Sequence, residues 1–184
     1  MPGSTWAQDV VRFWLEEAAP EKWFQKDPVL DAAVRGRFAH THEHVTNLPA
    51  DDCLTDAQTA LAAVIVLDQF SRNMFRGTAR AFASDAQALL LAQAAIARGF
   101  DLAVPEPGRL FFYLPFEHAE DAAAQARCVA LMTALADPGL VKWADAHHKA
   151  IIDRFGRFPH RNAILGRTST ADEVEFLSQP GSSF

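Results

Sequence analysis

Residues 61–76, with the sequence LAAVIVLDQFSRNMFR, decide the fold class of this chain. The first seven of these residues are all apolar, and a helix that is apolar on every side has to be buried among other elements. Thr55 and Gln58 have the spacing of a capping box just before this stretch, and Gly77 follows it as a helix stop. The sequence therefore predicts a buried helix from Thr55 to about Phe75.

The rest of the chain shows further helical signals. It contains 34 alanines, the strongest helix formers, and a single tyrosine. Three further pairs have capping-box spacing: Thr5/Gln8, Ser84/Gln87 and Thr170/Glu173. Together with apolar periodicity and Pro or Gly stops, these signals predict helices over residues 5–20, 27–46, 55–75, 84–99, 119–136 and 140–155. We therefore expect an all-α fold.

The predicted helices are joined by short connections. Adjacent helices linked by a few Pro or Gly residues have to pack antiparallel, so we expect helical hairpins within a single domain over residues 1–184. The segment from Val104 to Pro115 contains two further prolines, Pro105 and Pro107, before a run of large apolar residues. We interpret this segment as an apolar connection that tucks beneath a neighbouring helix.

The charge and apolar patterning disfavour several classes of protein. Lys and Arg number 17 and Asp and Glu number 23, so the net charge of −6 disfavours a general binder of nucleic acid or of acidic membrane surfaces. The longest apolar run is far too short to span a bilayer, and residues 1–6 lack the features of a signal peptide. We therefore expect a cytoplasmic protein. Cys53 and Cys128 are too few for a disulfide framework or a thiolate metal site, so we interpret both as plain thiols.

Charged side chains at the end of the buried helix form the first candidate site. Asp68, Arg72 and Asn73 follow directly after apolar residues, and a buried aspartate is costly unless it is paired. Asp68 and Arg72 have the i,i+4 spacing of a favourable ion pair, and Arg76 lies one turn further. The structural alternative is an intrahelical pair in which Arg72 and Arg76 stabilise the helix end.

Glu117 and His118 form the second candidate site. A carboxylate beside a titratable base suits acid/base chemistry near neutral pH. Neighbouring residues do not face each other on a helix, however, and Glu117 stands close to the start of the next predicted helix. The structural alternative is therefore that Glu117 complements the dipole of that helix.

The third candidate site contains the densest group of basic side chains. His148 lies on the apolar stripe of the predicted helix 140–155, so we expect it to point inward. An acid-free stretch of basic residues follows it, with Arg154, Arg157, His160, Arg161 and Arg167. Arginines near a core need carboxylate or phosphate partners. These partners come either from acids elsewhere in the fold or from a bound anion.

His40 and His44 share one face of a predicted helix with the spacing of paired zinc ligands, and His42 lies between them. That face also carries Arg37, whereas the apolar residues lie on the other side, so we interpret the histidines as solvated and predict no metal site. The sequence contains no nucleophilic elbow, phosphate-binding glycine loop or zinc-protease motif. We expect no bound cofactor.

Several segments together resemble one bacterial family. They are DQFSRNMFRG at residues 68–77, PFEH at 115–118, RFGRFPHRN at 154–162, LGR at 165–167 and the final GSSF at 181–184. This set is similar to the family called domain of unknown function 924 and covers nearly the whole chain. The resemblance implies a tetratricopeptide-like α-α superhelix, and it implies no particular reaction. Ser71 departs from the proline found in many relatives, and the histidines at 40–44 lie outside the family pattern.

The candidate segments carry complementary charges, so we expect a compact fold to bring them together. The prediction is that Asp68, Glu117 or His118 lies within ion-pair reach of Arg157, His160 or Arg161, around one cavity. The full predicted site comprises Asp68, Arg72, Asn73, Glu117, His118, His148, Arg157, His160 and Arg161.

Three functions remain open for this predicted site. The leading hypothesis is the binding of an anionic small molecule or a peptide carboxylate by the arginines. The alternative is an enzyme in which His118 or His148 acts as general acid or base while arginines stabilise negative charge. The third is a purely structural interaction protein without a cavity. The oligomeric state is also left open.

Overall fold

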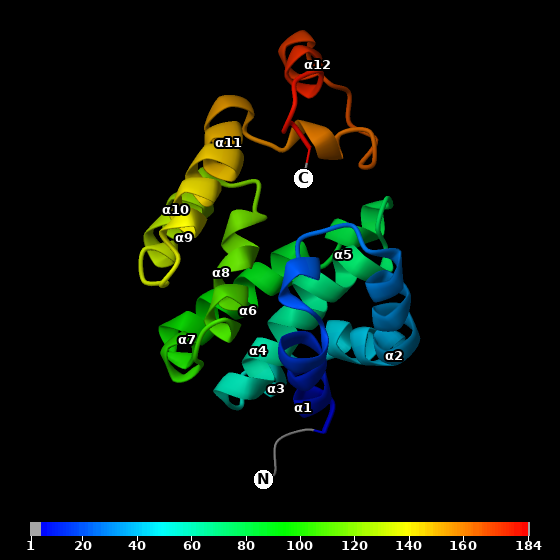
Figure 1. The fold of residues 1–184 in the computed structure, drawn as a ribbon, viewed down its shortest axis with the longest axis vertical. Helices are drawn as coiled ribbons and strands as arrows, with labels where there is room; N and C mark the ends of the chain where they lie inside the picture. The colour runs from blue at the N-terminus through cyan, green and yellow to red at the C-terminus, as the bar shows by residue number, and fades with distance from the viewer. Residues whose placement is uncertain (1–4, 184) are drawn as a thin grey trace. The chain divides into compact units, whose positions relative to one another are not determined.

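All regular structure in the described part of the chain is helical (Figure 1). The structure is a computed structural model and describes residues 5–183. The predicted all-α fold is confirmed, and the tetratricopeptide-like superhelix stays a prediction. Residues 1–4, part of the stretch expected not to be a signal peptide, and Phe184 of the GSSF motif lie outside the described residues. Within residues 5–183, no helix combines the length and the apolar composition that crossing a membrane requires.

The chain divides into two compact units, one of residues 5–76 and 80–115 and the other of residues 77–79 and 116–183. The first unit contains α1 (Thr5–Arg12), η1 (Phe13–Glu17), η2 (Pro20–Lys22), α2 (Pro28–Asn47), α3 (Ala50–Cys53), α4 (Ala57–Ile65), η3 (Val66–Phe70), α5 (Ser71–Met74), α6 (Asp85–Ala97) and α7 (Phe100–Ala103). The short η4 (Ala79–Phe82) and the helix α8 (Gly108–Glu117) each have residues in both units. The second unit contains α9 (Ala122–Met132), α10 (Pro138–Trp143), η5 (Ala144–Lys149), α11 (Ala150–Phe155), η6 (Pro159–Arg161) and α12 (Ala171–Leu177). Of the η elements, η1, η3 and η5 are π-helical and the others are 3₁₀-helical.

The predicted buried helix forms the centre of the first unit. It runs through α4, η3 and α5, and residues 59–71 are all buried. Helices α1 and α6 pack against α4, while α2 packs against η3 and α5. The cap differs by one residue from the prediction, because Asp56 rather than Thr55 accepts the hydrogen bond from the backbone N–H of Thr59, at 2.8 Å. An ionised aspartate at this position also complements the positive end of the helix dipole.

Other helix ends follow the sequence signals closely. Asp27 caps α2 by accepting hydrogen bonds from two backbone N–H groups. Thr170 and Glu173 form both bonds of the predicted capping box. Gly99 and Gly156, with φ of 72° and 69°, end α6 and α11 in the left-handed conformation that glycine adopts without strain. The local signals at these four helix ends are therefore confirmed. The predicted capping box at Ser84 is wrong, because Ser84 precedes α6 without a side-chain cap bond.

The interpretation of residues 104–115 as a connection is wrong, because Gly108–Glu117 forms α8. Five consecutive large residues of α8, Leu110 to Leu114, are 7% exposed or less. Burial on all sides of the helix stabilises it more than Pro115 destabilises it. Pro115 stands two residues before the end of α8, where a proline removes only one backbone hydrogen bond.

The second unit is built from the predicted helices over 119–136 and 140–155. They begin at Ala122 and Pro138, within three residues of the expected starts. Helix α9 packs against α10, η5 and α11. Beside them, Ile151, Ile152 and Phe158 form a small buried cluster, against which Phe155 and Phe176 pack. This cluster connects α11 with the C-terminal segment.

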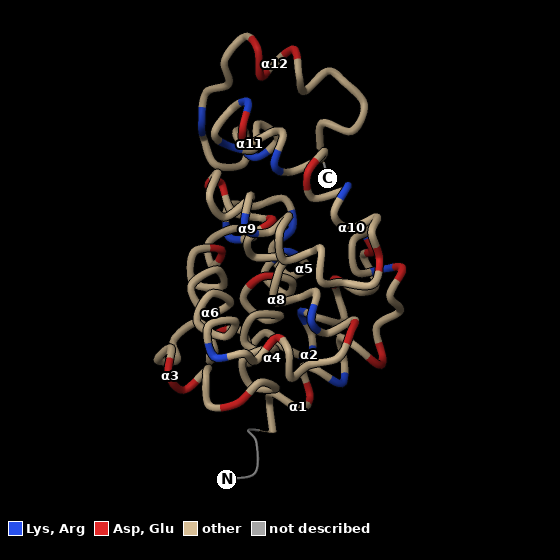
Figure 2. Tube along the Cα trace, turned by 90° about the vertical axis from the view of Figure 1, so that its left-hand side faces the viewer, with Lys and Arg blue, Asp and Glu red and all other residues tan. Residues whose placement is uncertain are grey.

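Charged residues of both signs are spread along the trace, as Figure 2 shows. Lys and Arg lie among Asp and Glu, so the net charge of −6 is not collected in one acidic segment. Local groups of charge therefore have to be judged from their own partners rather than from the net charge.

Candidate functional site

Two predicted site residues lie on π-helical turns. Asp68 belongs to η3, and His148 belongs to η5. A π-helical turn is rare in proteins and occurs frequently at functional sites, because it redirects the side chains of an otherwise regular helix. The two turns belong to different units, and each holds its own group of polar side chains.

The predicted pair of Asp68 and Arg72 is confirmed. Nη1 of Arg72 lies 3.1 Å from Oδ1 of Asp68, whose side chain is 1% exposed. Gln69 donates a hydrogen bond to the other carboxylate oxygen of Asp68, at 2.7 Å. Arg72 also donates to both oxygens of Asp85, at 2.9 and 3.0 Å. Arg72 therefore connects Asp68 of η3 with Asp85, the first residue of α6. Its contact with Asp68 is the intrahelical pair that the structural alternative describes.

Asn73 and Arg76 have a common partner that the sequence did not indicate. Asn73 donates to Asp31 of α2 at 2.8 Å, and Arg76 donates to both oxygens of Asp31, at 2.7 and 2.8 Å. Burial raises the pKa of Asp31, but the hydrogen bonds from Arg76 and Asn73 more than offset this effect and lower the pKa. Arg76 thus pairs with a carboxylate on another helix.

The expectation of solvated histidines is correct for His40 and His44, which are exposed, and wrong for His42. His42 is half-buried, and its Nε2 lies 2.8 Å from the hydroxyl oxygen of Ser71. Burial, followed by the charge of Arg80, lowers the pKa of His42. Within residues 5–183, no three His, Cys, Asp or Glu side chains are grouped so that they could hold a metal ion.

Glu117 and His148 form a buried pair in the second unit. Nδ1 of His148 lies 3.1 Å from Oε1 of Glu117, and the two side chains are 4% and 6% exposed. The predicted inward orientation of His148 is therefore confirmed. The sequence left open whether Glu117 takes part in acid/base chemistry or complements the dipole of the following helix. In the structure its carboxylate lies against a histidine of η5.

The backbone around Glu117 is held by one buried side chain. Nε2 of Gln125, on α9, donates to the carbonyl oxygens of Phe116, Glu117 and Ala119, at 3.3, 2.6 and 2.8 Å. Gln125 is completely buried. These bonds satisfy carbonyl groups that the end of α8 leaves without helical partners, and they fix the backbone that carries Glu117.

Further aromatic rings surround His148. The ring of His118 lies 6.4 Å from that of His148, and the Trp143 ring lies 6.2 Å from it. Trp143 also stacks on His147, with centroids 4.0 Å apart. His118 and His147 are half-buried, and Trp143 is 46% exposed. The group therefore extends from a buried histidine to side chains in contact with solvent.

Phe158 connects this group to His160 and Arg161. The rings of His148 and His160 lie 5.8 and 5.7 Å from the Phe158 ring, and the Arg161 guanidinium lies 4.5 Å from its centroid. Burial, then the charges of Arg161 and His148, lower the pKa of His160 to about 4. Three basic side chains thus contact one fully buried phenylalanine.

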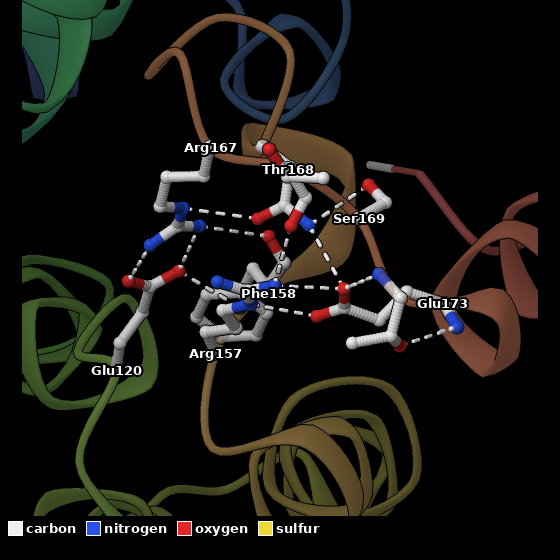
Figure 3. A network of polar contacts seen from close by, with 9 residues as sticks. Glu120, Arg157, Phe158, Arg167, Thr168, Ser169 and Glu173 are labelled. Atoms are coloured by element: carbon white, nitrogen blue, oxygen red, sulfur yellow. Dashed lines mark hydrogen bonds and ion pairs between the residues drawn. The ribbon is translucent and has the colours of Figure 1, made fainter.

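Figure 3 shows the partners of Arg157 and Arg167, two further arginines of the acid-free stretch. Arg157 donates to both oxygens of Glu173, at 2.7 and 2.8 Å. Arg167 donates to both oxygens of Glu120, at 2.6 and 2.9 Å. The hydrogen bond from Arg157 lowers the pKa of Glu173 to about 2. Both arginines therefore have bidentate carboxylate partners within the second unit.

The same network ties the backbone of the C-terminal segment together. Arg157 also donates to the carbonyl oxygen of Thr168 at 2.9 Å, and Arg167 donates to that of Phe158 at 3.2 Å. Glu120 accepts from the backbone N–H of Phe158 at 2.8 Å. Burial raises the pKa of Glu120, but the hydrogen bond from Arg167 and its charge more than offset this and lower it. These contacts are structural in kind, because each satisfies a polar group of the protein itself.

The structure brings the predicted residues together in two groups. Asp68 and Arg72 meet in the first unit, with Asn73 turned to Asp31. The second unit holds the rest of the predicted site, in which Arg157 is bound to Glu173. The prediction that Asp68, Glu117 or His118 reaches Arg157, His160 or Arg161 around one cavity stays a prediction.

Four acids that the sequence did not single out as partners are central to these contacts: Asp31, Asp85, Glu120 and Glu173. A signal was present only for Glu173, which belongs to a recognised capping box, where its carboxylate also accepts from the Thr170 backbone N–H at 2.7 Å. Cys53 and Cys128 are both buried thiols, and burial raises the pKa of each.

Comparisons with known proteins agree with the resemblance noted in the sequence. Residues 10–181 match the model of the family described as bacterial protein of unknown function (DUF924). The solved structure of a protein of unknown function from Agrobacterium tumefaciens is similar, with 46% sequence identity and a TM-score of 0.87. The similarity covers 93% of this chain and 96% of that one. None of the curated proteins matches the chain. The chain therefore belongs to the DUF924 family.

Proposed function

We propose that the second unit binds an anionic small molecule or a peptide carboxylate through His118, His148, His160 and Arg161, which we call the histidine–arginine cluster. One observation carries the proposal: His148, His160 and Arg161 all contact the ring of Phe158. Basic groups that gather on one apolar ring repel each other when charged, and a bound anion relieves this repulsion. The pKa of His160 is lowered first by burial and then by the same repulsion, from the charges of Arg161 and His148.

The partners of the neighbouring arginines narrow the proposed site. Arg157 and Arg167 are each neutralised by a bidentate carboxylate. Without Arg157, the predicted site residues of the second unit are the histidine–arginine cluster and Glu117, whose carboxylate lies 3.1 Å from His148. Asp68, Arg72 and Asn73 belong to the first unit, and their part in the same site stays a prediction.

Ligand-dependent thermal stability tests the proposal. Phosphate, acetate and a short peptide with a free C-terminal carboxylate should each be compared with chloride at constant ionic strength. A ligand that binds only the folded protein raises the melting temperature in a concentration-dependent manner. We expect this rise for at least one of the anions in the parent protein and a much smaller rise in Arg161→Gln.

Arg154→Ala is the matched control, because Arg154 also stacks on a phenylalanine of the same unit, at 4.6 Å from the Phe155 centroid, but is exposed and lies outside the cluster. This variant should keep the parent response. Equal anion responses in the parent, Arg161→Gln and Arg154→Ala would end the proposal, since they would show a general salt effect. The absence of any response would end it as well.

The acid/base enzyme is the second candidate, and the separation of 3.1 Å between Glu117 and His148 favours it. A carboxylate on Nδ1 orients an imidazole so that Nε2 can take or give a proton. The tests are hydrolysis of p-nitrophenyl acetate and p-nitrophenyl phosphate by the parent protein and by His148→Asn. A rate above background that disappears in His148→Asn but persists in Arg154→Ala supports this candidate, and a background rate in all three excludes it for these two ester classes.

A further inference from the structure

Three arginines follow one another at four-residue intervals in the sequence, and the third differs from the other two. Arg72 and Arg76 each bind a carboxylate in bidentate geometry, Asp85 and Asp31 respectively. Arg80 is exposed, and its guanidinium forms no hydrogen bond or ion pair with any residue in the range 5–183. Its position is instead determined by an aromatic ring.

The guanidinium of Arg80 stacks on Phe75. Its central carbon lies 3.8 Å from the ring centroid, closer than the centroid distance of 4.6 Å at which Arg37 lies over Phe13. Stacking holds the planar guanidinium in one orientation while its N–H donors stay free at the edge of the plane. An oriented arginine loses less conformational entropy when it binds an anion, so Arg80 is prepared for bidentate recognition.

His42 stands beside this stacked pair. Its ring meets the ring of Phe75 edge to face, with centroids 5.2 Å apart. Its Nε2 is engaged with the hydroxyl of the fully buried Ser71, which fixes the orientation of the imidazole. Both basic side chains therefore contact the ring of Phe75, and burial, followed by the charge of Arg80, lowers the pKa of His42.

We propose that Arg80 and His42 form a second anion site, in the first unit, that takes a phosphate group. A phosphate monoester carries nearly two negative charges at neutral pH, which match one guanidinium and one imidazole that becomes protonated on binding. Arg80 holds two phosphate oxygens through its edge donors, and Phe75 holds Arg80 in place. The site is independent of the histidine–arginine cluster, since none of its residues belongs to the second unit.

Nuclear magnetic resonance of the His42 ring tests this site directly, because each histidine of the chain gives its own signal. The probes are inorganic phosphate and a tripeptide with a central phosphoserine, each against chloride at equal ionic strength and constant pH. We expect a saturable shift of the His42 signal toward the protonated form. Tighter binding of the phosphopeptide than of inorganic phosphate assigns the site to phosphorylated peptides, and the reverse assigns it to free phosphate.

Three variants separate a built site from a general effect of charge. Arg80→Ala should weaken the affinity by about 10- to 100-fold, the loss expected for a charge-assisted bidentate contact. Arg80→Lys keeps the charge but not the planar fork and should recover only part of the affinity. Arg37→Ala is the control, because Arg37 is also stacked but already bound to Glu17 at 2.5 Å, and it should leave the affinity unchanged.

Two results would overturn the second site. One is the absence of a saturable His42 shift with either probe in the parent protein. The other is an unchanged affinity in Arg80→Ala, with a far-ultraviolet circular dichroism spectrum that shows the variant to be folded.

Discussion

Oε1 of Glu117 lies 3.1 Å from Nδ1 of His148, and less than a tenth of either side chain is exposed. Glu117 ends α8, while His148 belongs to the π-helical turn η5, so the pair joins two elements that are distant in sequence. A carboxylate in such surroundings is costly without a partner, and the imidazole provides one. The close approach of the two side chains therefore connects the end of α8 with η5, beside the histidine–arginine cluster.

Removal of the Glu117 carboxylate should destabilise the protein. We expect Glu117→Ala to lower the free energy of unfolding by about 1–3 kcal/mol, because His148 is left buried without this partner. Glu117→Gln keeps the size of the side chain and a hydrogen-bonding oxygen, so its effect should be smaller. Urea denaturation measures both, with the exposed Glu16→Ala as the control. A change below about 0.5 kcal/mol in Glu117→Ala, the usual range for surface residues, would show that the contact is unimportant.

His160 should make the protein sensitive to mild acid. Its pKa falls from 6.5 to about 4 on folding, chiefly through burial and then through Arg161, so the unfolded chain binds the proton more readily than the folded chain. Its contribution is therefore complete above pH 6.5 and is lost as the pH falls from 6.5 to about 4, amounting to about 3 kcal/mol. His160→Gln should remove this part of the pH dependence.

Urea denaturation of the parent and of His160→Gln at several pH values between 4 and 7 gives the difference, and a nuclear magnetic resonance titration gives the pKa of His160 itself. A pKa near 6.5, together with equal pH profiles for the two proteins, would contradict the expected burial of a neutral imidazole.

The helix caps give a matched pair of substitutions. Thr170 accepts a hydrogen bond from the backbone N–H of Glu173, whereas Ser84 precedes α6 without any side-chain cap bond. We expect Thr170→Ala to cost about 1 kcal/mol and Ser84→Ala to cost clearly less. Thermal or urea unfolding measures both variants. If both variants lost the same free energy of unfolding, the hydrogen bond from Glu173 to Thr170 would contribute nothing to stability.

Arg76 and Asn73 should act together, because both bind Asp31. We expect Arg76→Ala to lower the free energy of unfolding by about 1–2 kcal/mol, less than for a fully buried pair because 34% of the Arg76 side chain is exposed. In a double-mutant cycle, Asn73→Ala and Arg76→Ala should give a non-additive sum. The exposed Arg12, paired with Asp9, is the control, and its replacement should cost less than about 0.5 kcal/mol. Additive effects of the first two variants would show that the common carboxylate does not couple them.

Local signals in the sequence were sufficient for most helices. The apolar run at 61–67, the aspartate before Pro28 and the glycines at 99 and 156 each act within a few residues, so periodicity and capping are visible in the sequence itself. For residues 104–115, the prolines and the glycine predicted a connection, and this prediction is wrong. Gly108–Glu117 forms α8, because burial of its side chains stabilises the helix. Tertiary packing of this kind cannot be read from a local pattern.

The same distinction explains which site contacts could be predicted. Asp68 and Arg72 lie four residues apart on one helix, and their pair follows from helix geometry. The carboxylates that bind Arg76 and Arg167 lie 45 and 47 residues away in sequence. Their pairing depends on how the helices pack. The sequence indicated that the arginines needed anionic partners, but it left open whether these partners are acids of the protein or a bound anion.

The most direct test of the histidine–arginine cluster is a nuclear magnetic resonance titration of the ring signals of His118, His148 and His160. Phosphate, acetate and the peptide with a free C-terminal carboxylate are titrated in turn, at constant pH and ionic strength, and at least one of them should give the expected result. The proposed function predicts saturable shifts of these signals with one common dissociation constant, lost in Arg161→Gln and retained in Arg154→Ala. Signals that do not move, or that drift linearly without saturation in all three proteins, would contradict it.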